Sequence, residues 1–373
     1  MTRVRIVGLE ARSLRVPLVE PFVIASGRLD ATDAVEVSIV VEHEGRRVVG
    51  LGECATLPPV THETPAEIEA HVRALSARWQ GLELADVEAL CEHAFRQSSW
   101  ASAAMGPVAR AGLETAWLDV AGRLRERSLA TLLAGDSRGA TSKHETDITL
   151  PIAEPARMGE LARGWVARGF RALKVKVGRA LEEDVAGLRA VVEAAPDALL
   201  RLDANAALSS SEALRLLDAV RALGGVVEIF EQPCRADDLA GMADVVRGAG
   251  VPVVADESCQ SLEDLLRLLD AGAATGINLK LVKNGGPLAS FEIGHRAKLA
   301  GMKVMAGAMV ETRLGLAAML HVVTALGGVD YVDLDTALLL AEDPYEGGYE
   351  EALPMLTLAE TPGHGVQRRA RGA

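Results

Sequence analysis

From residue 144 onward, the chain alternates short apolar runs with longer amphipathic segments. Eight short apolar runs follow one another at intervals of about 25 residues, a period typical of a repeated supersecondary unit. The first lies in residues 144–152 and the last in residues 330–335. Helical periodicity fills the intervals, in residues 155–169, 181–194, 211–224, 237–250, 262–272, 291–301 and 313–326. Eight strands with seven intervening helices predict an α/β protein with a parallel barrel of TIM type.

The first 55 residues follow a different pattern, in which apolar and polar residues alternate. This period of two is typical of strands with one buried face, and it predicts a small antiparallel sheet. Residues 21–32, which are rich in small side chains, are interpreted as an exposed loop, and residues 53–63 as a second loop. The second loop ends in the segment TPAE at 64–67, which has the form of a capping box with proline in the first helical turn. Helical patterns then continue to about residue 135.

These patterns divide the chain into two predicted domains. Residues 1–135 form an α+β capping domain, whose loops near 21–30 and 53–63 are expected to close over the mouth of the barrel and select the substrate. Residues 136–339 form the barrel. The tail from about 340 to 373 contains proline and glycine but no further strand–helix unit. We expect this tail to fold back and complete the capping domain.

Composition excludes several classes of function. The formal net charge is −13, whereas nucleic-acid binders concentrate Lys and Arg, so no nucleic-acid partner is expected. Hydrophobic residues make up 49% of the chain and aromatic residues only 3%, so Leu, Val and Ala must build the core. No signal peptide or long apolar run is seen, and no membrane partner is expected. Four cysteines without CxxC spacing predict free thiols in the cytoplasm: Cys54, Cys91, Cys234 and Cys259.

Charged residues end successive apolar runs of the predicted barrel. Lys174 and Lys176 end the second run. The third, fourth and fifth runs end in carboxylates and the sixth ends in a lysine: Asp203, Glu231, Asp256 and Lys280. The strand ends of such a barrel meet at one face, where reactive residues collect, so we expect these side chains to converge. The ordered set indicates an enzyme with a metal between two basic groups.

The first two lysines lie two residues apart on one strand, so Lys174 and Lys176 share a face, which in a barrel is the interior. A buried pair of lysines is costly unless it is used. Each cation disfavours the charge on the other, which predicts a lowered lysine pKa and a usable base near neutral pH. An edge strand with solvated lysines is the alternative. The acid that ends the following strand argues against it.

Three carboxylates at one barrel mouth repel one another unless a hard cation joins them. Oxygen ligands in this number suit Mg²⁺, so Asp203, Glu231 and Asp256 are the candidate metal ligands. Each acid alone is better explained as a strand-end cap or a surface group. Asn205 shares a face with Asp203 and is a candidate support for the metal site. Glu257 is expected to point away from the face of Asp256 and to have a supporting role.

Two further features lie at the end of the barrel series. Lys280 is expected to face Lys176 across the mouth, and Lys283, three residues later, competes for the same role. Asp333 and Asp335 share a face of the last run. Two more carboxylates beside a metal site need another cation, and a substrate ammonium group would serve. A turn or a helix cap is the alternative explanation of this pair.

The ordered motifs resemble those of the enolase superfamily, and within it the muconate-lactonising-type subgroup. The resemblance covers essentially the whole chain and rests on KVKVG, LDAN, EQP, ADES and INLKLVKNGG. It implies a modified (β/α)7β barrel, Mg²⁺ as the cofactor, and Lys176 and Lys280 on opposite faces of a substrate α-carbon, with Lys174 tuning Lys176. The segment VMAGAMVE lacks the histidine that is typical of the mandelate racemase subgroup.

Within this subgroup, GAMVETRLG and DLDTALLLAEDPYEGG resemble segments of the dipeptide epimerases. The resemblance implies that Asp333 and Asp335 bind the α-ammonium group of a dipeptide and that Thr149 helps to hold the substrate. Met309 and Glu311 belong to the first segment and are candidate substrate contacts.

One position departs from the Ala-Glu epimerases that the chain resembles. Those enzymes carry a carboxylate-binding arginine in the loop after the PF dipeptide. Ser26 or Gly27 holds that place here, and Arg28 comes one or two positions late. Ser26 and Arg28 are therefore candidate substrate contacts, and a substrate with a Glu side chain is disfavoured.

The resemblance implies a reaction class. It implies a homo-oligomeric, Mg²⁺-dependent dipeptide epimerase that inverts the α-carbon of the C-terminal residue by two-base 1,1-proton transfer through an ene-diolate. The free cysteines and the missing signal peptide predict that this enzyme is cytoplasmic. Racemisation of N-acylamino acids, o-succinylbenzoate synthesis and cycloisomerisation share the lysines and the acids, but their substrates offer no ammonium group. A non-catalytic metal-binding barrel is the alternative from another class, and the presence of both lysines and all three acids argues against it.

Overall fold

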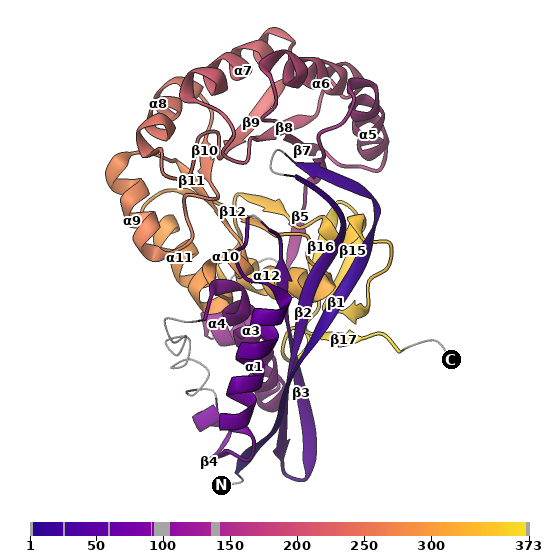
Figure 1. Cartoon of the computed structure of the whole chain (residues 1–373), viewed down its shortest axis with the longest axis vertical. Helices are drawn as coiled ribbons and strands as arrows, with labels where there is room; N and C mark the ends of the chain where they lie inside the picture. The colour runs from indigo at the N-terminus through magenta and orange to yellow at the C-terminus, as the bar shows by residue number, and fades with distance from the viewer. Residues whose placement is uncertain are drawn as a thin grey trace.

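A computed structural model describes residues 3–24, 27–58, 60–90, 92, 105–135 and 142–370. A barrel surrounded by helices occupies one end of the molecule, and a long antiparallel sheet with its own helices extends from it to the other end (Figure 1). Within the described ranges, no helix combines the length and the apolar character that crossing a membrane requires.

Eight parallel strands form the nearly closed barrel, and each pairs with the next strand along the chain. The strands are β6 (Ile148–Leu150), β7 (Ala172–Lys176), β8 (Leu199–Asp203), β9 (Val226–Glu231), β10 (Val253–Ala255), β11 (Gly276–Leu279), β12 (Lys303–Gly307) and β13 (Tyr331–Asp333). The helices between them are α5 (Pro155–Ala167), α6 (Leu181–Ala194), α7 (Ser210–Ala222), α8 (Leu239–Ala249), α9 (Leu262–Ala271), α10 (Leu281–Asn284), α11 (Pro287–Leu299) and α12 (Arg313–Ala325). The predicted α/β barrel is confirmed.

The two end strands, β6 and β13, meet at a seam. The Asp147 amide donates to the carbonyl oxygen of Val332 at 3.0 Å, and the Leu334 amide donates to the Thr146 hydroxyl at 2.9 Å. Arg201 reaches across from β8 and donates to Asp147 Oδ2 at 2.8 Å and to the Val332 carbonyl at 3.1 Å. A buried ion pair therefore helps to close the barrel.

Replacing Arg201 with methionine is expected to lower the free energy of unfolding by about 3–5 kcal/mol, because the buried Asp147 loses its cation. Burial, and then the nearby Asp333 carboxylate, already raise the pKa of Asp147. Urea unfolding measures the loss. The double variant Arg201→Met/Asp147→Asn is expected to recover much of it. Equal losses in the single and double variants would contradict the ion-pair explanation.

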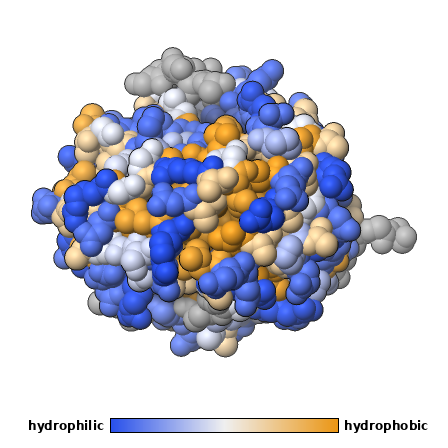
Figure 2. Space-filling model, turned by 90° about the horizontal axis from the view of Figure 1, so that it is seen from above, coloured by the Kyte–Doolittle hydropathy of each residue, from blue (hydrophilic) through white to orange (hydrophobic). Residues whose placement is uncertain are grey.

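The outer surface of the barrel end, seen from above in Figure 2, carries both hydrophobic and hydrophilic residues. Hydrophobic residues gather near the middle of this face, and hydrophilic residues surround them.

The capping sheet is antiparallel, in the order β3-β2-β1-β4. Its strands are β1 (Val4–Ile24), β2 (Gly27–His43), β3 (Arg46–Thr56) and β4 (Glu83–Leu84), and its helices are α1 (Pro65–Trp79), α3 (Pro107–Arg125) and α4 (Leu129–Ala134). The predicted capping box at the start of α1 is confirmed, since the Thr64 and Glu67 side chains and backbones bond reciprocally.

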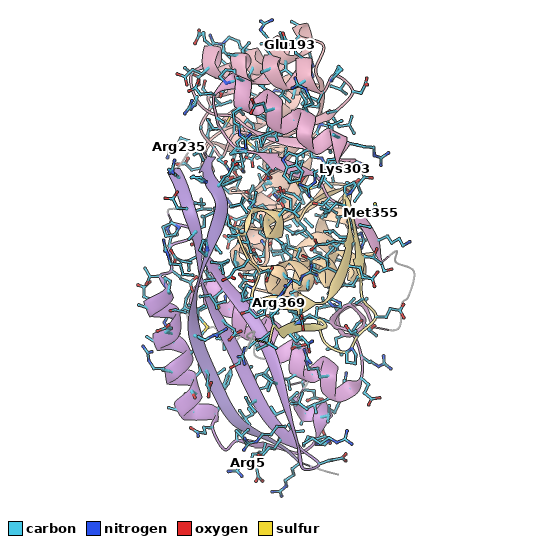
Figure 3. All side chains as sticks on the ribbon, turned by 90° about the vertical axis from the view of Figure 1, so that its right-hand side faces the viewer. Arg5, Glu193, Arg235, Lys303, Met355 and Arg369 are labelled. Atoms are coloured by element: carbon cyan, nitrogen blue, oxygen red, sulfur yellow. The ribbon has the colours of Figure 1, made fainter. Side chains whose placement is uncertain are left out.

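The prediction of an exposed loop over residues 21–32 is wrong for most of that segment. β1 and β2 continue through it as a hairpin, in which Phe22 pairs with Leu29. Phe22 is buried in a small apolar cluster with Val310 of the barrel and Leu340 of the tail. This long-range contact stabilises strand structure that the small neighbouring residues do not suggest. In Figure 3 the hairpin rises to the level of Arg235, in the loop after β9.

Glycines allow α3 to pack directly on β3. A Cβ atom at Gly52 would overlap the carbonyl oxygen of Gly112, and one at Gly50 would overlap that of Ala116. The helix and strand backbones are therefore in contact, which only residues without a side chain permit.

Gly52→Ala is expected to destabilise the protein by about 1–3 kcal/mol, because the added methyl group overpacks this contact. Gly164→Ala provides the control, since position 164 is exposed on α5 and a Cβ atom there meets nothing within 4 Å. That change is expected to stabilise by about 0.5–1 kcal/mol. Thermal unfolding measures both, and an unchanged Tm for Gly52→Ala would contradict the packing argument.

The C-terminal segment returns to the capping sheet. It contains η1 (Thr336–Leu339), β14 (Tyr345–Gly347), β15 (Tyr349–Ala352), β16 (Met355–Leu358) and β17 (Val366–Arg368), and β16 pairs with β5 (Lys143–Glu145). Tyr345 Oη and Arg368 Nε donate to Glu36 Oε2 of β2 at 2.7 and 2.9 Å. These bonds join the tail to the N-terminal sheet.

Candidate active site

Strand β7 carries two lysines that point into the barrel. Lys174 is 2% exposed and Lys176 is 8% exposed. Lys174 Nζ lies 2.7 Å from Asp333, 2.8 Å from Glu231 and 3.0 Å from Asp203. Lys176 Nζ donates to Asp203 Oδ2 at 2.6 Å. Both ammonium groups therefore lie among carboxylates that come from other strands.

Strands β8, β9 and β10 bring three carboxylates to the same end of the barrel. Asp203 and Glu231 are the last residues of their strands, and Asp256 follows the last residue of β10. All three are buried. Lys280, the residue after β11, donates to Asp256 Oδ2 at 2.7 Å. The lysines and acids that the sequence singled out thus lie in one buried cluster.

Lys283 also reaches Asp256, but it is held by the backbone. Its ammonium group donates to Asp256 Oδ1 at 2.7 Å and to the carbonyl oxygens of Asp256 and Asn278 at 2.8 and 2.6 Å. Three acceptors occupy its three donors. This geometry suits a structural clamp, and it leaves Lys280 as the candidate base on this side.

The last strand places two acids beside β6. Asp333 accepts from Lys174 at 2.7 Å and from the Thr149 hydroxyl at 3.4 Å. Asp335 Oδ2 accepts from the Thr149 amide at 2.6 Å. Asp335 Oδ1 is buried without a hydrogen-bond partner. Because a buried carboxylate oxygen without a donor is costly, this atom is a candidate acceptor for a ligand N–H group.

Two family models match nearly the whole chain. The mandelate racemase / muconate lactonizing enzyme N-terminal domain matches residues 7–134, and the enolase C-terminal domain-like model matches residues 157–371. The chain belongs to the enolase superfamily.

Enolase-superfamily relatives with named activities cover almost all of the chain. An L-Ala-D/L-amino acid epimerase of Populus trichocarpa is 38% identical over 95% of this chain and 83% of its own length. An aromatic dipeptide epimerase of Herpetosiphon aurantiacus is 34% identical over 96% of this chain and 98% of its own. The crystal structure of a dipeptide epimerase from Enterococcus faecalis, complexed with Mg and L-Leu-L-Tyr, has a TM-score of 0.87 and 33% identity over 98% of this chain and 100% of that one.

The three strand-end acids of this superfamily member have the chemistry of a Mg²⁺ site. Their donors are all carboxylate oxygens, which this ion prefers. Glu231 Oε2 is buried and lies 2.8 Å from the Lys174 ammonium group, so this oxygen is already placed to accept a cation. In the described part of the chain, no three such side chains are grouped as a ready-made metal site, and the Lys174 ammonium lies between Asp203 and Glu231. The three acids therefore fit Mg²⁺, provided that the Lys174 ammonium group moves out from between Asp203 and Glu231.

The electrostatics of the cluster differ from the prediction. Burial alone would lower the pKa of Lys174, but Asp203, Asp333 and Glu231 outweigh it and raise that pKa. The pKa of Lys280 is also raised, because Asp256 outweighs burial. The lowering of a pKa that was predicted for the Lys174–Lys176 pair is wrong for Lys174, since neighbouring carboxylates dominate over the neighbouring ammonium group.

Other predicted contacts lie in different surroundings. Met309 and Glu311 are buried in the turn after β12, where the Met309 amide donates to Glu311 Oε1 at 3.0 Å. Burial raises the pKa of Glu311 to about 7. Arg28 is exposed and donates to Asp30 Oδ1 at 3.0 Å. Ser26 lies outside the described residues.

Asn205 and Glu257 join the cluster at its edge. Asn205 accepts from Lys176 at 3.2 Å and donates to Glu257 Oε1 at 3.4 Å. Glu257 was expected to point away from Asp256. It lies beyond the end of β10, in a turn where strand alternation no longer applies, and burial and then Asp256 raise its pKa to about 7.

Sequence reasoning missed two buried residues that hold the acids in place. Gln232 Oε1 accepts from the amides of Asp256 and Ser258 at 2.8 and 3.1 Å. Asn278 donates to Glu231 Oε1 at 2.7 Å. Asn278 lies two residues before Lys280, so period-two alternation on β11 could have placed it in the interior.

A cavity of about 680 Å³ lies elsewhere in the protein. It is lined by residues around α4, the end of α12 and the segment 358–362. None of the site residues discussed above lines it, so it is not a candidate for the catalytic pocket.

Proposed function

We propose that this protein is a Mg²⁺-dependent dipeptide epimerase, which inverts the α-carbon of the C-terminal residue of a dipeptide. The observation that carries this proposal is the buried pair Asp333 and Asp335, with Asp335 Oδ1 unpartnered, beside a cluster with lysines at both ends. The free ammonium group of a dipeptide supplies the missing donor. An N-acylated or nitrogen-free substrate has no such group.

The two lysines are the proposed bases. Lys176 contacts Asp203 on β8 and Lys280 contacts Asp256 beyond β10, with β9 between them. They therefore approach the carboxylate cluster from two sides. One lysine takes the α-proton and the other returns a proton to the opposite face, which inverts the centre. Lys174, held by three carboxylates, stays charged beside Lys176.

The α-proton of an amino acid residue is very weakly acidic, so its removal needs strong stabilisation of negative charge. Asp203, Glu231 and Asp256 are the proposed Mg²⁺ ligands, with Asn205 and Glu257 in support. When bound, Mg²⁺ supplies Lewis-acid stabilisation of charge on the substrate carboxylate.

The remaining parts of the chain have proposed roles around this centre. Residues 1–135, with the tail from 340 to 373, form the capping domain, and residues 136–339 form the catalytic barrel. Thr149, Met309, Glu311, Ser26 and Arg28 are proposed substrate contacts. We also propose that the enzyme is cytoplasmic and homo-oligomeric, with a small-molecule partner only. The buried free thiols of Cys54, Cys234 and Cys259, and the apolar area in Figure 2, support this.

A pooled library of L,L-dipeptides in D₂O with Mg²⁺ tests the proposal. Mass spectrometry is expected to detect a gain of one mass unit in some dipeptides, which reports exchange of the α-proton. Matched N-succinyl amino acids, run in parallel, test the N-acylamino acid racemase alternative. Exchange in N-succinyl amino acids alone would overturn the dipeptide assignment. Exchange in no substrate, with no Mg²⁺ binding by calorimetry, would favour a non-catalytic barrel.

A further inference from the structure

Two glutamates of the capping domain lie at the N-termini of barrel helices. Glu53 belongs to β3 and contacts the start of α12, and Glu114 belongs to α3 and contacts the start of α11. These two helices follow the turns that carry Met309–Glu311 and Lys280. The contacts therefore join the capping domain to two parts of the proposed site.

Glu53 accepts three kinds of donor at α12. Thr312 N–H donates to Oε1 and Oε2 at 3.0 and 3.2 Å, the Thr312 hydroxyl donates to Oε2 at 2.5 Å, and Gly315 N–H donates to Oε2 at 3.0 Å. Glu53 is only 4% exposed. The two carboxyl oxygens satisfy free N–H groups at the helix N-terminus, while burial and then the Glu311 carboxylate raise the pKa of Glu53 to about 8.

The turn before α12 has a second bond to the capping sheet. Thr32 of β2 donates its hydroxyl hydrogen to the carbonyl oxygen of Val310 at 2.5 Å. Thr336, the residue after Asp335, accepts from the Glu311 amide at 3.2 Å and donates to the Glu311 carbonyl at 3.0 Å. The capping sheet, the turn at 309–312 and the acidic pair are thus connected by hydrogen bonds.

Glu114 makes the corresponding contact at α11. Its Oε1 accepts from Leu288 N–H at 2.7 Å, while the N-cap residue Gly286 supplies no side chain. Gly285 and Gly286 have φ angles of 92° and 126°, and Cβ atoms there would meet Arg110 and Glu114 of α3. The glycine pair lets α3 approach the short helix α10 that follows Lys280.

We propose that Glu53 and Glu114 are positioning residues for the reaction, which fix the turn at 309–312 and the turn after Lys280 against the capping domain. This inference rests on the proposed epimerase function. Glu114 supplies from the capping domain what barrel helices α7, α8 and α9 obtain from their own neighbouring residues, Ser209, Asp238 and Ser261. Helix α12 has a cap of its own, since the Thr312 hydroxyl accepts from Leu314 N–H, and Glu53 adds a bond to Gly315 N–H. Neither glutamate touches the reacting atoms.

Glutamine variants test this inference with little change of shape. Glu53→Gln keeps one acceptor oxygen but turns an NH₂ group toward amide donors, and Glu114→Gln makes the same change at α11. Each is expected to reduce kcat by about 10- to 100-fold, with a smaller change in KM, since a small misplacement of reacting groups has effects of this size. Hydrogen–deuterium exchange is expected to speed up in residues 309–316 for the first variant and in residues 280–290 for the second.

The matched control is Asp238→Asn. Asp238 caps α8 by accepting from Gly241 N–H at 2.8 Å, a bond made within the barrel itself. Asparagine caps helices about as well as aspartate, so kcat and exchange in both segments should match the unchanged protein. If Glu53→Gln does not fold, Thr32→Val loosens the same turn by removing only the bond to Val310, with the same expected loss of kcat.

The outcomes separate the two proposals. If the unchanged protein is inactive on all dipeptides, the epimerase assignment fails. Amide hydrogen–deuterium exchange in residues 309–316 and 280–290 still tests whether the two glutamates position these segments. An active protein whose Glu53→Gln, Glu114→Gln and Thr32→Val variants keep kcat within about twofold while Tm falls would overturn the inference, because a purely structural role predicts that pattern.

Discussion

Replacing Lys176 or Lys280 with alanine is expected to abolish epimerisation of dipeptides. Each lysine is the proposed acid or base on one side of the α-carbon, and loss of such a group typically costs about 10²–10⁴-fold in rate. The fold should survive both changes. Asp203 keeps Lys174 as a partner at 3.0 Å, and Asp256 keeps Lys283 at 2.7 Å, so neither variant leaves a buried acid without a cation.

Deuterium exchange of the substrate α-proton distinguishes the roles of the two lysines, which a measurement of turnover alone cannot do. The remaining lysine can still remove and return a proton on its own face, so each variant is expected to exchange the α-proton of one epimer without inverting it. The two variants should prefer opposite epimers. Lys298→Ala is the control, since that lysine donates to the carbonyl oxygens of Leu326 and Gly328 on the barrel exterior. Normal epimerisation by either Lys176→Ala or Lys280→Ala would rule out the two-base mechanism.

Replacing Asp335 with asparagine is expected to reduce kcat/KM for free dipeptides by about 10- to 100-fold. This loss corresponds to about 1.5–3 kcal/mol for one charge-assisted hydrogen bond to the substrate ammonium group. The pH dependence should change too. Burial and then Asp333 raise the pKa of Asp335 to about 6, so kcat/KM of the unchanged enzyme should fall below pH 6, as protonation removes the negative charge that binds the ammonium group.

Two comparisons isolate this effect. N-acetylated dipeptides carry no ammonium group, so the variant and the unchanged enzyme should treat them alike. Asp330→Asn removes an exposed carboxylate just before the same strand, where it pairs with Lys303, and it should leave kcat/KM unchanged. If kcat/KM of the Asp335→Asn variant falls below pH 6 in the same way, a group other than Asp335 causes the fall.

The barrel and its cluster could be predicted because two periods coincide in the sequence. The strand–helix repeat places every strand end at the same face, and Lys174, Asp203, Glu231 and Lys280 each lie at the end of a strand or one to two residues from it. Few other arrangements satisfy both the period and the order of charges. Local spacing was therefore enough to bring together residues that are distant along the chain.

Features that depend on contacts between the two parts of the chain could not be predicted in this way. Phe22 stabilises the hairpin through Val310 and Leu340, which no local pattern reveals. The lysine pKa values depend on how many carboxylates surround Lys174, and that number comes from three dimensions. Glu53 appeared only as the first residue of a loop, since its partners at Thr312 and Gly315 lie far along the chain.

The position of the proposed ammonium site at the seam between β6 and β13 means that bound substrate should stabilise the barrel. Thr149 lies on one side of this seam, and Asp335, with its unpartnered oxygen, lies on the other. A dipeptide whose amino end docks there ties the ends of the barrel together. Bound substrate at 100 times its Kd should therefore stabilise the folded state by about 2.7 kcal/mol, and amide protection should rise first along the join between the first and last strands.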